Sequence, residues 1–71
     1  MWRGTGTSKL ARREAELARA EHERSEGARR FALSQTDDRM RAHFLSLAAK
    51  FERESIAHLE RARRLEARAA S

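Results

Sequence analysis

Apolar residues in the second half of the chain recur at the spacing of an α-helix. They fall on one face when the chain is wound at about 3.6 residues per turn. No Pro or Gly interrupts this stretch, so we predict one long helix over about 37–69. Its apolar face is wide, which indicates that the helix packs against two neighbours and not one. Its apolar positions are Met40, Phe44, Leu47, Ala48, Phe51, Leu59, Ala62 and Leu65, with Leu45 and Ile56 to one side.

The first half shows a thinner helical pattern. Leu10, Leu17, Arg24 and Phe31 are spaced by seven, with small and polar residues between them. We predict a helix over about 8–34, in which Gly27 either permits close approach of a neighbour or marks a kink. Residues 1–8, MWRGTGTS, contain Trp2 and two of the three Gly residues, and they predict a flexible N-terminal arm.

A short polar segment separates the two helices. Thr36, Asp37 and Asp38 precede the second helix, where their oxygens can accept hydrogen bonds from the free N–H groups of its first turn. Short connections join antiparallel helices, so the sequence predicts an all-α, antiparallel two-helix hairpin over 9–71. Folding about Thr36 sets Glu14 opposite His58, and Ser55 is interpreted as a small packing position.

Composition supports this fold class. The chain has no Cys, Pro, Val or Tyr, and it is rich in Ala, Arg, Glu and Leu, which favour helices over strands. No apolar run is long enough to span a membrane, and MWRGTGTS lacks the apolar stretch of a signal peptide. We therefore expect a cytoplasmic protein without membrane contact. No catalytic motif is present, so we expect neither an enzyme nor a cofactor.

Size predicts self-association. A lone hairpin within 71 residues buries too little apolar surface to be more than marginally stable. We expect two copies to form a homodimeric four-helix bundle that acts as a protein–protein interaction module, an adaptor or regulator. The residues expected to form its core are Leu10, Leu17, Phe31, Met40, Phe44, Leu45, Leu47, Phe51, Ile56, Leu59 and Leu65.

Two alternative functions follow from polar residues. The open end of the hairpin gathers basic side chains of the kind that contact phosphates, and the net charge is +5, so nucleic acid is the first alternative. A carboxylate–His metal site is the second, with Glu54 and His58 as candidate ligands, although their spacing differs from the Glu-x-x-His of di-iron bundles. The expected nucleic-acid contacts are Arg12, Arg13, Arg61, Arg63, Arg64 and Arg68.

The run ARRFALSQTDDRMRAHFLSLAAKFERESIAHLERA, residues 28–62, resembles short alphaproteobacterial helical-hairpin proteins of unknown function. Their pattern is Leu-Ala-x-x-Thr-x-Asp, then Arg-Ala, then Leu-x-Leu-Ala-x-x-Tyr/Phe-Glu. The later parts are matched here by Arg41, Ala42, Leu45, Leu47, Ala48, Phe51 and Glu52. The first part corresponds to Phe31, Ala32, Thr36 and Asp37, with Phe in place of Leu and a spacing that differs by one residue on each side of Thr36. Asp38 stands where such sequences often carry Pro. The resemblance implies a two-helix hairpin in a bacterial cytoplasm and transfers no functional residue.

Overall fold

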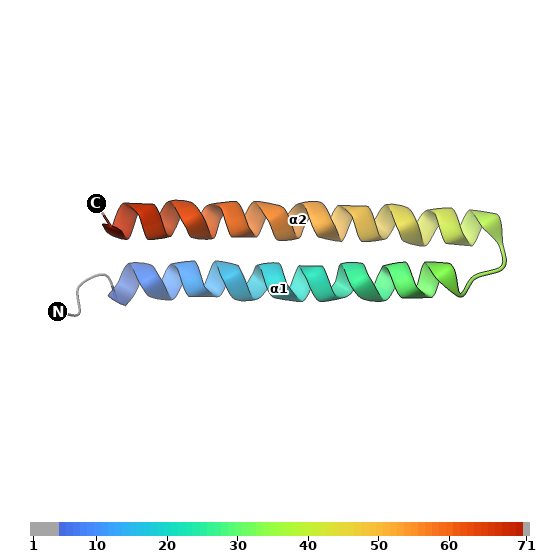
Figure 1. The fold of residues 1–71 in the computed structure, drawn as a ribbon, viewed down its shortest axis with the longest axis horizontal. Coiled ribbons are helices and arrows are strands. Elements are labelled where there is room, and N and C mark those ends of the chain that lie inside the picture. The colour runs from blue at the N-terminus through green and yellow to red at the C-terminus, as the bar shows by residue number, and fades with distance from the viewer. Residues whose placement is uncertain (1–4, 71) are drawn as a thin grey trace.

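The protein is a hairpin of two long helices. The computed structural model describes residues 5–70, with side chains from residue 9 onward. Helix α1 spans Thr5–Leu33 and helix α2 spans Asp38–Ala70, and these residues form no strand. The helices lie side by side and antiparallel, with the connecting loop at one end and the start of α1 and the end of α2 at the other (Figure 1). The predicted all-α hairpin is confirmed.

The helix bounds differ little from those predicted. Helix α1 begins three residues earlier than expected, so residues 5–8 of the predicted arm belong to it. Trp2 lies outside the described residues. The bounds of α2 differ from the prediction by one residue at each end. Neither helix, over the residues described, is long and apolar enough to cross a membrane.

Side-chain and backbone hydrogen bonds close the connection between the helices. The backbone N–H of Arg39 donates to Oδ1 of Asp37 at 2.8 Å, which makes Asp37 the N-cap of α2. At the end of α1, the Ser34 hydroxyl donates to the carbonyl oxygen of Phe31 at 2.7 Å. The guanidinium of Arg41 donates back to the carbonyl oxygen of Gln35 at 3.0 Å. These bonds fix the turn that makes the helices antiparallel.

Small residues form the contact between the two helices, here called the seam. The seam consists of Ala11, Ala18, Ser25 and Ala32 on α1 with Ala48, Ser55 and Ala62 on α2. Within each helix these residues are spaced by seven, and all are buried. Short side chains let two helix backbones approach closely, so the seam binds the helices without enclosing any large side chain.

One hydrogen bond sets the register of the seam. The Ser55 hydroxyl donates to the backbone carbonyl oxygen of Ala18 at 2.8 Å, and Ser55 is 4% exposed. The prediction that Ser55 is a small packing position is therefore confirmed. Ser25 is also fully buried, but its hydroxyl has no hydrogen-bond partner among the described residues.

Gly27 is not a point of close helix approach. A Cβ atom added at Gly27 would meet no atom within 4 Å in the described hairpin. Helix α1 also continues through this position to Leu33. The interpretation that Gly27 admits a neighbouring helix is thus wrong for the hairpin itself, because the seam runs along a different row of residues.

Candidate interaction surfaces

Large apolar side chains flank the seam on one side and form a surface that we call the Leu–Phe face. Phe31 of α1 contacts Phe44 of α2 edge to face, with ring centroids 4.7 Å apart. At the other end, Leu10 and Leu65 line the same hollow. Residues whose numbers differ by a multiple of seven share one side of a helix. The row of Leu10, Leu17 and Phe31 on α1 and the row of Phe44, Phe51 and Leu65 on α2 therefore lie on this side of the seam. The face comprises Leu10, Leu17, Phe31, Met40, Phe44, Leu47, Phe51 and Leu65.

The single hairpin leaves this face largely uncovered. Leu17 is 41% exposed and Phe31 is 50% exposed, although both are residues that proteins usually bury. Phe44, Leu47, Phe51 and Leu65 are only half-buried. The residues expected to form a core are therefore outside the core of one chain and available to a partner.

The opposite side of the seam carries a smaller apolar surface. Ile56 and Leu59 line a shallow hollow there and are 49% and 40% exposed. His22 of α1 lies in the same hollow, with its Nδ1 3.2 Å from Oε1 of Glu52 on α2. The sequence pattern did not predict this contact between the helices. We call the surface containing Leu45, Ile56 and Leu59 the opposite face.

A polar cluster interrupts the Leu–Phe face near the open end. Nδ1 of His58 lies 2.6 Å from Oε1 of Glu14, which confirms the predicted pairing. Nδ1 of His58 also lies 3.0 Å from Nη2 of Arg61, so it is the donor when it bonds Glu14 and the acceptor when it bonds Arg61. Nε of Arg61 donates to the same oxygen at 3.3 Å. The hydrogen bond from His58 is the largest cause that lowers the pKa of Glu14; burial opposes it, and the Arg61 guanidinium adds to the lowering.

Four arginines surround a hollow at the open end. The hollow has a volume of about 400 Å³ and is lined by Arg13, Arg61, Arg64 and Arg68, with Leu10 and Leu65 as its apolar part and Glu14 at its edge. Arg12 and Arg63 are not among its lining residues. The structure therefore brings together four of the six arginines expected to contact nucleic acid. We call this site the open-end hollow.

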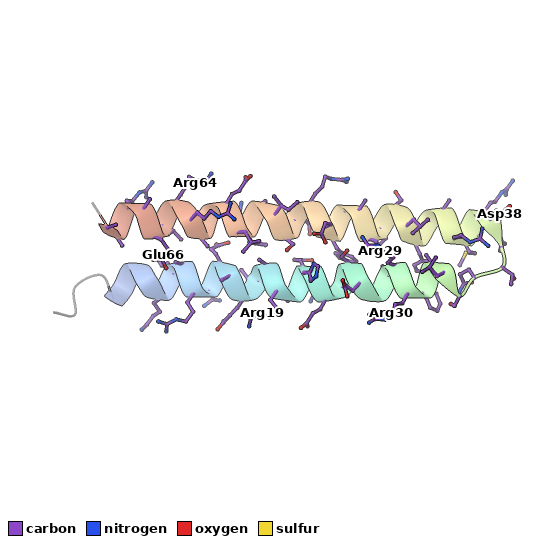
Figure 2. All side chains as sticks on the ribbon, in the orientation of Figure 1. Arg19, Arg29, Arg30, Asp38, Arg64 and Glu66 are labelled. Carbon is purple, nitrogen blue, oxygen red and sulfur yellow. The ribbon has the colours of Figure 1, made fainter. Side chains whose placement is uncertain are left out.

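Other charged side chains project away from the seam. Arg30, for example, extends from the side of α1 remote from α2 (Figure 2). Ion pairs within one helix, such as Arg30 with Glu26 at 3.8 Å, are exposed and contribute little to stability. The outer edges of the hairpin are thus polar, in contrast to the Leu–Phe face.

The two metal-ligand candidates do not meet in the hairpin. His58 is bonded to Glu14 on α1, whereas Glu54 is exposed. Within the described part of the chain, no group of three or more His, Asp or Glu side chains is arranged to hold a metal ion.

No protein-family model, curated protein or solved structure matches the chain. The resemblance to short alphaproteobacterial hairpin proteins therefore stays a prediction.

Proposed function

We propose that this protein is a small, non-enzymatic helical interaction module that self-associates as a homodimeric four-helix bundle. The observation that carries the proposal is that small residues form the seam, while the large apolar residues lie outside it on the Leu–Phe face. The seam uses only Ala and Ser, so the Leu, Phe and Met side chains of the Leu–Phe face remain exposed or only half-buried. A large exposed apolar surface is typical of a protein interface.

Packing against a second copy buries the apolar area that the seam alone does not bury. Ala and Ser bury little apolar area, whereas each Leu or Phe transferred from water contributes roughly 1.5–3 kcal/mol. A hairpin held by its seam alone is therefore marginal, and its stability depends on association. The resulting bundle still carries the opposite face, which is the surface left for a different protein partner in the cytoplasm.

Mass in solution tests the proposal. We expect light scattering at micromolar concentration to give a dimer of the 8.2 kDa chain, and helix content to rise with concentration. A monodisperse, fully helical monomer over that range would overturn the proposal.

A pair of Leu variants in the same helix gives the matched comparison. Leu17→Gln removes an apolar side chain from the Leu–Phe face, and it should raise the dimer dissociation constant at least tenfold. Leu33→Gln changes a 72% exposed residue on the other side of α1 from Phe31, and it should leave association unchanged. Equal effects of the two substitutions would show that the Leu–Phe face is not the interface.

We propose binding of single-stranded nucleic acid at the open end as a second candidate function. The observation that favours it is the convergence of Arg13, Arg61, Arg64 and Arg68 on one hollow. Binding that neutralises phosphates should weaken steeply as salt rises from about 50 to 200 mM. Arg61→Gln with Arg64→Gln should reduce the fluorescence anisotropy of a labelled RNA oligonucleotide. The same loss of charge in Arg29→Gln with Arg30→Gln, near the loop, should not.

A further inference from the structure

The two ends of the Leu–Phe face differ in shape. At the open end, Leu10 and Leu65 lie in a hollow of about 400 Å³. At the loop end, Phe31 pairs with Phe44, and Met40 lies one helical turn before Phe44; Phe31 and Met40 are 50% and 41% exposed. One end is thus a hollow that contains two Leu side chains, and the other presents exposed aromatic and thioether side chains.

From this difference we infer that a second copy of the chain docks antiparallel on the Leu–Phe face and seats its Phe31–Phe44 pair in the open-end hollow. The inference rests on the proposed self-association and names its geometry. A two-fold axis through the middle of the face then fills both hollows in the same way. A parallel arrangement would instead set hollow against hollow and aromatic pair against aromatic pair.

Charge favours the same arrangement. Residues 9–20 and 52–70, which form the open half, hold nine Lys or Arg and six Asp or Glu. Residues 21–51, the loop half, hold six Lys or Arg and five Asp or Glu. Parallel docking would bring the two more basic halves together, whereas antiparallel docking sets each against a nearly neutral half, which reduces repulsion.

The side chains that line the hollow favour the binding of aromatic side chains. Arg13, Arg61, Arg64 and Arg68 line the hollow together with Leu10 and Leu65, so a phenyl ring in the hollow has both aliphatic and guanidinium neighbours. Guanidinium groups are attracted to aromatic faces within about 6 Å. The hollow therefore offers the partner's Phe31 and Phe44 both apolar burial and cation–π contact.

The area of the face matches a stable dimer. The hairpin measures 56 × 14 × 10 Å along its principal axes. A face of 56 by 14 Å is close to the roughly 800 Å² per partner that standard protein interfaces bury. A full-length antiparallel contact thus reaches this size, while a contact confined to one end would not.

Distance measurement between labels tests the orientation. The chain has no Cys, so Lys9→Cys places one spin label at an exposed site of the open end without reactive background. In an antiparallel dimer the two labels lie near opposite ends of a 56 Å body, and pulsed electron resonance should give a separation on that order. When labelled Lys9→Cys chains are mixed with labelled Leu33→Cys chains, the mixed dimers should show an additional short distance between the two different labels.

The outcomes separate the geometry from the proposed function. A dimer whose two Lys9→Cys labels give only a short distance would overturn antiparallel docking and leave self-association intact. A monomer by light scattering would overturn both, including a monomer that gains mass only with single-stranded RNA.

A second pair of variants tests whether the open-end hollow is part of the dimer interface. Leu10→Gln lies in the hollow and is 55% exposed in one chain, so it leaves the seam intact and should weaken the dimer at least tenfold. Leu59→Gln makes the same kind of change on the opposite face and should not. The reverse pattern would place the second copy on the opposite face and overturn the inference.

Discussion

Ser55 and Ala18 lie 37 positions apart in the chain, and the Ser55 hydroxyl donates a 2.8 Å hydrogen bond to the Ala18 carbonyl oxygen. The bond crosses the seam near the middle of both helices, where the hydroxyl is shielded from water. A backbone carbonyl in a helix has a second lone pair available, so this bond adds to the helical hydrogen bonding of α1 without replacing it. It favours one register of the two helices over a slipped one.

Substitution of each of the two seam serines should change the free energy of unfolding differently, because one hydroxyl is hydrogen-bonded and the other is not. Ser55→Ala removes the bond to Ala18 and should lower the free energy of unfolding by about 0.5–1.5 kcal/mol. Ser25→Ala removes a buried hydroxyl that has no partner among the described residues, and it should be neutral or stabilising. Urea denaturation at one fixed protein concentration measures both. A larger loss for Ser25→Ala than for Ser55→Ala would contradict the seam described above.

The Asp37 cap should be the polar group on which the start of α2 most depends. Its carboxylate accepts from the backbone N–H of Arg39, so Asp37→Ala should cost about 1 kcal/mol. For a chain of this size that corresponds to roughly 4–8 °C in Tm. Thr36→Ala, in the exposed residue before the cap, should stay within about 0.5 kcal/mol. Thermal melts followed by circular dichroism compare the two, and equal Tm losses would mean that Asp37 is not the cap.

The sequence predicts the hairpin well because its signals are local. Helical spacing, the polar segment around Thr36 and the acidic start of α2 each depend on neighbouring residues. Folding the chain about Thr36 even placed Glu14 opposite His58, since two straight antiparallel helices keep one register along their length. The cap is assigned by the structure to Asp37 among three neighbouring candidates.

The choice of seam could not be read from the same pattern. In α1 the row of Leu10, Leu17 and Phe31 lies one residue before the row of Ala11, Ala18 and Ala32, so both rows fit a single helical face. Hydrophobicity alone favours the large row as the core. Two helices present only one pair of rows to each other, and the small row permits closer backbone approach. The large row is therefore left at the edge of the described hairpin, where its side chains stay largely exposed.

Gly27→Ala should stabilise the hairpin. Alanine favours a helix interior by about 1 kcal/mol over glycine, and the new methyl group meets nothing within 4 Å. We expect the urea midpoint to rise while the dimer dissociation constant is unchanged. If association weakens instead, Gly27 lies under the second copy, and the interface extends beyond the Leu–Phe face around α1.

The Glu14 cluster should make stability depend on pH on the acid side. His58 and Arg61 hold the pKa of Glu14 below its ordinary value of 4.5, so the folded state binds the proton of Glu14 less readily than the unfolded state does. The stabilising contribution is therefore complete above the ordinary pKa, and it is lost as the pH falls through the lowered one. Between about pH 5 and pH 3, the native chain should lose stability that a Glu14→Gln variant never had.

The measurement is a series of urea unfolding curves from pH 3 to pH 6 at fixed protein concentration. The native chain should be more stable than Glu14→Gln at pH 6, and the difference should shrink as the pH falls. Glu16→Gln is the matched control, because Glu16 is an exposed carboxylate two residues along the same helix. Its difference from the native chain should stay small and nearly constant. A gap for Glu14→Gln that persists unchanged to pH 3 would show that the bond to His58 acts through packing and not through the charge of Glu14.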